Sequence, residues 1–355
     1  MKISKLFLAA LISSVFFVSC SSDDNGGGTP LGTYDDGVLI LNQGGFGAGN
    51  ASISYLSDDF VTQQNNIYGI VNPSLMLGDT GQDIGFYQNL AFIVLNASNK
   101  IEIVNRYSMV HVATITEGLD NPRYITFSNG KGFVTNWGDG TSTTDDFVAV
   151  LNLDNYTVSS TIPVVEGPER IVENNGKVYV AHAGGFGYGS SISAINADNN
   201  TVATSIQVGD VPNSLKIQGN SLYVICGGKA SWTGTETVGK LSKINLSNNA
   251  VTSINFPEGD HPSNIEIVDN SLFYTIDSEV YKSTVSATTL PTEALFSTTA
   301  QGVYGVYSFA VKNNKIYVGD AVDYSSNGKV YIYSATGTLE NSYNVGVIPA
   351  GFYFN

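Results

Sequence analysis

The sequence predicts an all-β protein folded as a seven-bladed β-propeller. Five segments read alike: each runs through an apolar strand, turns at Asn-Gly or an equivalent pair, and resumes as an alternating strand. A third and a fourth strand follow each of these hairpins. No stretch after residue 30 sustains the apolar spacing of three and four that marks a helix. Repeats of four short strands are typical of propeller blades.

Prolines set the period of the repeat. Pro122, Pro168, Pro212 and Pro262 open successive units at intervals of 46, 44 and 50 residues. Six complete blades are therefore expected at 75–121, 122–167, 168–211, 212–261, 262–305 and 306–348. The segment before them supplies three strands only, and the final residues, "IPAGFYFN", repeat the proline-initiated opening. The C-terminal strand is expected to complete blade one, which would leave no free sheet edge.

The N-terminal residues predict an exported lipoprotein. Residues 1–19 have the charged start and short apolar run of a signal peptide, and Cys20 follows as the residue to be lipidated. Residues 20–35 are expected to form a flexible tether, and 36–355 the propeller. These features indicate an outer-membrane protein held by its lipid anchor and exposed at the cell surface. Simple secretion, with Cys20 incidental, is the alternative.

Net charge and cysteine content exclude nucleic acid as an expected partner and an internal disulfide. The chain carries 31 acidic and 16 basic side chains, a net charge of -15, and has no basic cluster. Nucleic acid is therefore not an expected partner. Once Cys20 is lipidated, only Cys226 remains, so no internal disulfide forms. Cys226 ends an apolar strand and is expected to be buried rather than reactive.

One face of the predicted propeller carries the long loops. Loops between the second and third strands share a face with the connections between blades, and they include the glycine-rich loop from Ala183 to Ser190. We call this side the loop-rich face. Its aromatic residues predict a ligand-binding surface, the alternative for each being packing against a neighbouring loop: Phe46, Trp137, Phe186, Tyr188, Trp232 and Tyr324.

Polar residues open the inner strands, at the expected mouth of the central channel on the same face. Converging polar groups of this kind suit an amide-bearing or sugar-like ligand. Alternatively, Arg123, Glu169 and Arg170 form an ion network that holds neighbouring blades together. The residues are Gln82, Asp83, Arg123, Glu169, Arg170, Asn213 and Asn264.

Catalytic and metal-binding groups are few, and no catalytic residue, metal or cofactor is predicted. A hydrolase or lyase would have to use His182 or His261, both expected to reach the loop-rich face, together with Glu169. His111 falls in an outer-strand pattern. The loop containing Asp139, Asp145 and Asp146 lacks the spacing of an EF-hand, so a solvated acidic loop is favoured over a Ca²⁺ site.

The repeat consensus resembles the YncE-like seven-bladed propellers. The segments "TYDDGVLILNQGGFG", "NPRYITF", "VGDAVDYSSNGKVYIYSATGTL" and "VGVIPAGFYFN" further resemble surface lipoproteins close to the BtuG type. That resemblance implies capture of cobalamin, or a similar bulky polar nutrient, and its transfer to an outer-membrane TonB-dependent transporter. The alternative is a surface protein that grips another protein or a glycan and binds no small molecule.

Overall fold

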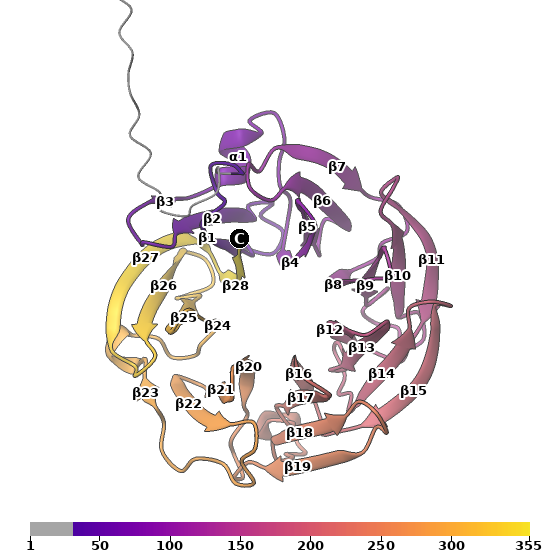
Figure 1. Ribbon diagram of the computed structural model, residues 1–355, viewed down its shortest axis with the longest axis vertical. Coiled ribbons are helices and arrows are strands. Elements are labelled where there is room, and N and C mark those ends of the chain that lie inside the picture. The colour runs from indigo at the N-terminus through magenta and orange to yellow at the C-terminus, as the bar shows by residue number, and fades with distance from the viewer. Residues whose placement is uncertain (1–30) are drawn as a thin grey trace, which may run out of the picture. The chain divides into compact units, whose positions relative to one another are not determined.

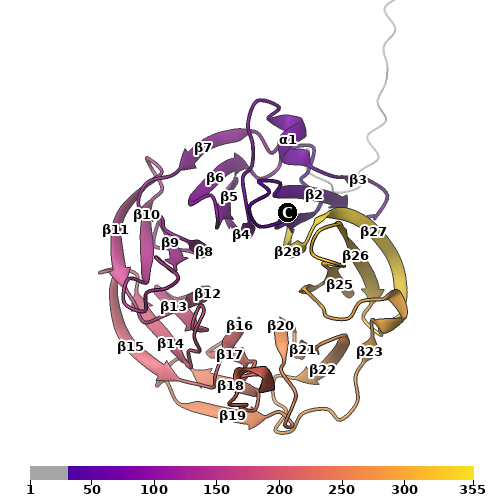
Figure 2. The same ribbon diagram turned by 180° about the vertical axis from the view of Figure 1, so that it is seen from behind.

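The computed structural model describes residues 31–355, which form a ring of seven antiparallel sheets with four strands each (Figure 1). The prediction of an all-β, seven-bladed propeller is confirmed. In blades 2 to 7 the strand nearest the central channel comes first in the sequence and the next three strands follow outward in order, whereas in blade 1 the C-terminal strand takes the inner place. Figure 2 shows the same ring from behind.

The first four blades, each given from the inner strand outward, are built as follows. Blade 1 contains β28 (Pro349–Phe354), β1 (Gly37–Asn42), β2 (Ser52–Ser57) and β3 (Gln63–Gln64). Blade 2 contains β4 (Gly81–Tyr87), β5 (Leu90–Leu95), β6 (Lys100–Asn105) and β7 (His111–Ile115). Blade 3 contains β8 (Pro122–Ser128), β9 (Lys131–Asn136), β10 (Phe147–Asn152) and β11 (Thr157–Pro163). Blade 4 contains β12 (Pro168–Asn174), β13 (Lys177–His182), β14 (Ser191–Asn196) and β15 (Thr201–Gln207).

The remaining three blades repeat this order. Blade 5 contains β16 (Pro212–Gln218), β17 (Ser221–Cys226), β18 (Lys240–Asn245) and β19 (Val251–Asn255). Blade 6 contains β20 (Ser263–Val268), β21 (Ser271–Ile276), β22 (Glu279–Thr284) and β23 (Phe296–Ser297). Blade 7 contains β24 (Ser308–Lys312), β25 (Lys315–Asp320), β26 (Asn327–Ser334) and β27 (Leu339–Val347).

Helix is almost absent from the described residues. The connection between β3 and β4 holds one short helix, α1 (Ile67–Val71), whose Ile67 and Tyr68 are buried. Two single 3₁₀ turns span Ser231–Thr233 and Thr299–Gln301. Within residues 31–355, no helix has both the length and the apolar character needed to cross a membrane.

The C-terminal strand closes the ring, as the sequence predicts. In β28, Tyr353 pairs with Leu39 of β1 and Phe352 pairs with Ile40, in antiparallel register. The backbone N–H of Asn355 donates to the carbonyl of Gly37 at 3.0 Å, and the Arg106 guanidinium donates to the carbonyl of Phe354 at 3.0 Å. The two ends of the propeller therefore share one sheet and are tied to blade 2 as well.

Apolar side chains fill the spaces between neighbouring blades. Phe133 of blade 3 packs with Val178 and Val180 of blade 4, and all three are fully buried. Since strands alternate their side chains, each sheet offers one apolar face to each neighbour. Tyr34, which the sequence places in the tether, is buried and packs edge-on against Tyr55 at 5.1 Å between ring centroids. The predicted signal peptide and Cys20 lie outside the described residues.

Candidate ligand-binding face and central channel

The two faces of the propeller differ in their loops, as expected. At the face opposite the loop-rich face, two-residue turns join the first and second strands of blades 2 to 7, as at Asn129 and Gly130, both of which have positive φ. On the same face, four or five residues join the third and fourth strands of each blade except blade 6, where residues 285–295 do so. At the loop-rich face, five blades carry long insertions between their second and third strands: 43–51, 137–146, 183–190, 227–239 and 321–326. Long connections within blades are therefore concentrated on the loop-rich face, with residues 285–295 as the exception.

Three of the predicted aromatics project fully from the loop-rich face. Phe46 is 85% exposed, Phe186 is 79% exposed and Trp232 is 82% exposed. Tyr188 and Tyr324 are also exposed, and Tyr324 leans edge-on against Tyr307 at 5.8 Å between ring centroids. Large apolar side chains left in solvent on one face are a signature of binding surfaces.

One exposed aromatic escaped the sequence prediction. Tyr304 lies in the connection from blade 6 to blade 7 and is 87% exposed. Tyr304 belongs to a connection between blades, whereas the predicted aromatics lie on long loops within blades.

Trp137 has a mixed role. The guanidinium carbon of Arg123 lies 4.0 Å from the centre of its ring, and Phe186 meets it edge-on at 5.8 Å. Its indole Nε1 is buried without a hydrogen-bond partner. Trp137 therefore anchors the loop around it, and Phe186 rises above it into solvent.

Glycines let the loop from Ala183 to Ser190 fold tightly over the entry to blade 4. Gly167 has φ of 63°, and a Cβ there would overlap the backbone of Gly184 and Gly185. The Gly167 carbonyl accepts a hydrogen bond from the N–H of Ala183 at 3.0 Å. The close approach of these two backbones explains the glycine content of the loop.

Irregular pairing aims the polar residues into the channel mouth. In blade 3 the register between β8 and β9 shifts between Pro122 and Ile125, and in blade 4 the same shift lies between Pro168 and Ile171. Bulges of this kind re-aim side chains without ending the sheet. Related shifts occur in blades 2, 5 and 6, so that every predicted channel-mouth residue lies at or beside one.

Arg123 and Glu169 form the ion network that the sequence offered as an alternative. The guanidinium donates to both oxygens of the carboxylate, at 2.9 and 2.8 Å, and joins β8 to β12. Both side chains are largely buried. Arg123 is thus engaged by Glu169 and by the ring of Trp137 at once.

Arg170 is not part of that network. Its guanidinium carbon lies 4.2 Å from the centre of the Tyr124 ring, and within residues 31–355 its nitrogens make no hydrogen bond and have no carboxylate within 4.0 Å. It lines a cavity of about 310 Å³ inside the channel. We call this space the Arg170 cavity.

Asp83 also lines the Arg170 cavity, but its oxygens are occupied. One accepts from the Tyr353 hydroxyl at 2.9 Å and the other from the N–H of Ile125 at 3.0 Å. Burial raises the pKa of the Asp83 carboxyl, against the lowering effect of the Ile125 N–H and of Arg170. Asp83 therefore links β4, β8 and β28.

The amide residues at the mouth make mostly structural contacts. Gln82 donates to the Tyr124 hydroxyl at 2.8 Å, and Asn213 donates to the carbonyl of Pro262 at 3.0 Å. Asn264 has φ of 56° and donates to the carbonyl of Val306 at 3.1 Å. The Asn213 Oδ1 is buried without a partner. The structure brings these residues to one place and leaves few of their donors free.

Among residues 31–355, no histidine is hydrogen-bonded to the Glu169 carboxylate, which binds Arg123. His182 was expected to reach the loop-rich face, and this is wrong: it is 1% exposed, and its Nε2 lies 2.8 Å from the Ser193 Oγ. As the last residue of β13 it follows the inward alternation of that strand. Burial lowers its pKa to about 4. His261 contacts the carbonyl of Gly227 at 2.7 Å and Glu236 at 3.6 Å, and His111 lies on the outer strand β7.

The acidic loop is organised by internal hydrogen bonds. Asp139 accepts from the N–H of Thr141 at 3.0 Å, and Asp145 accepts from the N–H of Asp139 at 2.9 Å. Asp146 is buried and accepts from the N–H of Gly167 at 2.8 Å. In the described part of the chain, no three His, Cys, Asp or Glu side chains gather as a metal site.

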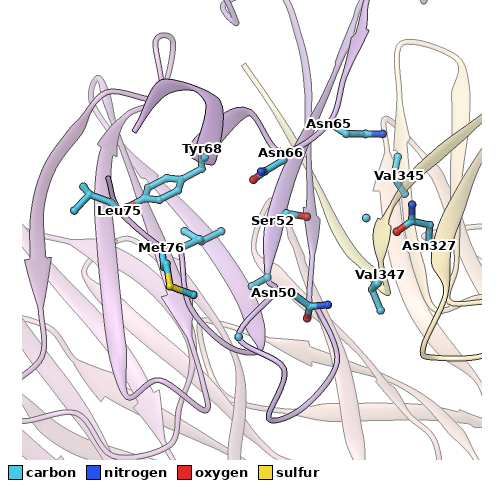
Figure 3. Close-up of a pocket in the computed structure, with 15 residues that line it drawn as sticks. Asn50, Ser52, Asn65, Asn66, Tyr68, Leu75, Met76, Asn327, Val345 and Val347 are labelled. Atoms are coloured by element: carbon cyan, nitrogen blue, oxygen red, sulfur yellow. The ribbon is translucent and has the colours of Figure 1, made fainter. Parts of the chain in front are cut away.

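A second cavity, of about 440 Å³, opens between blades 1 and 7 at the loop-rich face. Tyr68, Leu75 and Met76 lie on one side of it and Asn327, Val345 and Val347 on the other, as Figure 3 shows. Asn50, Ser52, Asn65 and Asn66 add amide and hydroxyl groups. The sequence prediction missed this groove because its walls come from opposite ends of the chain.

The fold and its loops define a seven-bladed β-propeller with its long loops concentrated on one face. The family model described as "Domain of unknown function (DUF5074)" matches residues 36–355, and the chain belongs to this family. No curated protein sequence matches the chain.

Solved structures share the fold at low sequence identity. A putative 6-phosphogluconolactonase from Bacteroides fragilis is 13% identical, with a TM-score of 0.63 over 91% of this chain and 99% of its own. A functionally unknown protein from Desulfotomaculum acetoxidans is 12% identical, with a TM-score of 0.62 over 90% and 99%. A quinonprotein alcohol dehydrogenase-like protein from Bacteroides thetaiotaomicron is 11% identical, with a TM-score of 0.62 over 90% and 78%. These likenesses show the propeller alone.

Proposed function

We propose that the protein captures a bulky polar nutrient, cobalamin or a chemically similar molecule, on the loop-rich face and passes it to an outer-membrane TonB-dependent transporter. The observation that carries the proposal is the exposure of Phe46, Phe186 and Trp232 on that one face. Flat aromatic side chains provide large contact areas at little cost in conformational entropy.

The groove between blades 1 and 7 supports the same proposal. Asn50, Asn65 and Asn327 line it with amides, and Met76, which is 74% exposed, adds apolar surface. Amide groups beside apolar area suit a large ring system that carries amide side chains. The resemblance to cobalamin-capturing lipoproteins favours cobalamin as the specific ligand.

The lipid anchor at Cys20 would hold the propeller at the outer membrane beside its transporter. Capture needs only preorganised contacts over a wide area, and the closed ring supplies a rigid frame for the loops. Changing Cys20 to Ala is expected to move the protein from the membrane fraction to the soluble fraction. Unchanged membrane association would contradict the anchor.

Calorimetric titration with cyanocobalamin tests capture directly, using a chain that begins at residue 31, since residues 31–355 form one compact unit. We expect 1:1 binding that Trp232→Ala or Phe186→Ala weakens about 30-fold, as for a binding hot spot. The matched control is Val61→Ala, which truncates a residue that is 81% exposed in the turn between β2 and β3 on the opposite face.

Two outcomes would overturn the proposal. Absence of heat and of any thermal shift with cyanocobalamin would remove this ligand and make a protein or glycan partner the next candidate. Binding that both aromatic substitutions leave unchanged would remove the aromatic surface as its site. Transfer is tested separately by growth on limiting cyanocobalamin, where loss of this protein should lengthen the lag.

A further inference from the structure

A separate binding site lies inside the channel, within the Arg170 cavity. We propose that this cavity binds a small organic anion through a carboxylate or phosphate group, held by the Arg170 guanidinium and by the hydroxyls of Tyr124 and Ser214. This site is distinct from the proposed capture of a bulky nutrient on the loop-rich face.

The first observation is the free guanidinium of Arg170. Its neighbour Glu169 accepts hydrogen bonds from Arg123 on both carboxylate oxygens and makes none with Arg170. Within residues 31–355, no acceptor is hydrogen-bonded to any of its N–H groups. Its contact is with the face of the Tyr124 ring, which holds the planar group in place and leaves its edge open. That edge matches the two oxygens of a carboxylate or phosphate.

The second observation is that two hydroxyl donors, from blades 3 and 5, line the same cavity. Tyr124 accepts a hydrogen bond from Gln82 Nε2 at 2.8 Å, and its own O–H has no acceptor among the described residues. Ser214 accepts from the N–H of Ile265 at 2.9 Å, and its O–H is free in the same way. Tyr124, Arg170 and Ser214 all line the Arg170 cavity. Three donor groups whose hydrogens have no acceptor favour a negatively charged ligand.

The third observation concerns the carboxyl groups in the cavity. Asp83 is occupied by Tyr353 and the N–H of Ile125, and Glu266 is paired with Lys216 Nζ at 3.1 Å. Burial raises the pKa of both carboxyls, and the positive charge of Arg170 lowers it. Neither carboxylate lies within 4.0 Å of the Arg170 nitrogens, so the guanidinium has no contacting counter-ion among residues 31–355.

The size of the cavity limits the ligand. A volume of about 310 Å³ is at the lower end of small-molecule pockets and is too small for a corrin. Ile171, Leu215 and Phe309 line part of the wall, so the remainder of the ligand meets both apolar and polar surface.

Calorimetry and thermal shift on the purified full chain test the proposal, with succinate and glycerol 3-phosphate as probes and glycerol as the neutral control. We expect one of the two anions to bind once per chain and to raise the melting temperature, and glycerol to do neither. The preferred probe tells whether a carboxylate or a phosphate is the natural group. Arg170→Gln should weaken binding about tenfold or more, and Arg170→Lys should weaken it less because the charge remains.

Controls separate this site from the loop-rich face and from misfolding. Lys282→Gln removes an exposed cation on β22 and should leave anion binding unchanged. Tyr124→Phe keeps the ring under Arg170 and should still cost several-fold in affinity, which covers the case in which Arg170→Gln does not fold. Cyanocobalamin binding should be the same in all of these variants. Absence of anion binding up to about 10 mM, or equal binding by Arg170→Gln, would overturn the proposal.

Discussion

The Arg123 guanidinium and the Glu169 carboxylate form a two-pronged ion pair across the boundary between blades 3 and 4, with N···O distances of 2.9 and 2.8 Å. Each residue opens the inner strand of its blade, so the pair stabilises the ring where it borders the channel. Arg123 also lies against Trp137, which connects the pair to the loop-rich face.

Removing one partner of this pair should destabilise the protein strongly. Glu169→Ala leaves a largely buried guanidinium without its counter-ion, and we expect a loss of about 3 kcal/mol in the free energy of unfolding. Denaturant titration measures it. The control is Glu340→Ala, which breaks the ion pair with Lys315. This pair is more exposed than the Arg123–Glu169 pair, so the substitution should cost less than about 1 kcal/mol of unfolding free energy. Equal losses would contradict the structural role of the Arg123 pair.

The two tryptophans should separate stability from binding. Trp137→Ala removes the ring between Arg123 and Phe186 and should cost about 2 kcal/mol of unfolding free energy. Trp232→Ala truncates a ring that is 82% exposed and should change stability by no more than about 0.5 kcal/mol. Thermal and denaturant unfolding of both variants measures the difference. A large loss from Trp232→Ala would show that its loop packs more tightly than its exposure indicates.

Deleting residues 349–355 should abolish the cooperative unfolding transition. The deletion removes β28, so that β1 and the inner wall of blade 1 lose their partner. Phe352→Ala is the milder counterpart, since it keeps the backbone pairing and loses packing on Tyr317. It should unfold cooperatively at a lower temperature. A cooperative transition at the native temperature in the deletion variant would show that the ring does not need its closing strand.

Stability should fall as the pH is lowered from about 6.5 to about 4, in part because of His182. Burial lowers the pKa of His182 from 6.5 to about 4, so in this window the unfolded chain takes up a proton that the folded chain does not. The contribution is at most about 3 kcal/mol at the acid end. Asp83 and Glu266, whose pKa values are raised by burial, act in the opposite direction. Comparing the pH profiles of wild type and His182→Gln isolates the histidine, and parallel profiles would contradict its assignment.

Cys226 should be inert in the folded protein. It is fully buried, and burial raises the pKa of its thiol to about 12. In a chain that begins at residue 31, Ellman's reagent at pH 8 should react with it only after guanidinium is added. Rapid modification of the native protein would mean that β17 opens readily.

Most of the fold could be predicted from the sequence repeat, because each recurring segment corresponds to one blade. Pro122 and Pro168 begin equivalent strands of successive blades. The N-terminal segment supplies only three strands, so the sequence already indicated that the C-terminal segment completes blade 1. Side-chain direction was harder to predict. His182 was misjudged because one residue at the end of a strand decides whether a side chain points inward or joins the following loop.

In the channel, too, the directions of individual side chains could not be predicted from the sequence. Glu169 and Arg170 are consecutive, and the bulge in β12 sends one to Arg123 and the other into the cavity. Nothing in the order of these residues reveals which is paired. Tyr124 contacts Arg170, and Tyr353 contacts Asp83. In the sequence, neither tyrosine differs from the other aromatic residues of the strands. Their roles depend on contacts between strands of different blades.

Ring closure by β28 also sets an order of events during synthesis. The N-terminal strand β1 leaves the ribosome long before residues 349–354, and until they arrive its inner edge has no partner. Throughout that interval blade 1 offers backbone donors and acceptors to any strand nearby, including one from a neighbouring chain. The protein therefore completes its first blade last, and until those final residues dock, the inner edge of β1 is open to pairing with another chain.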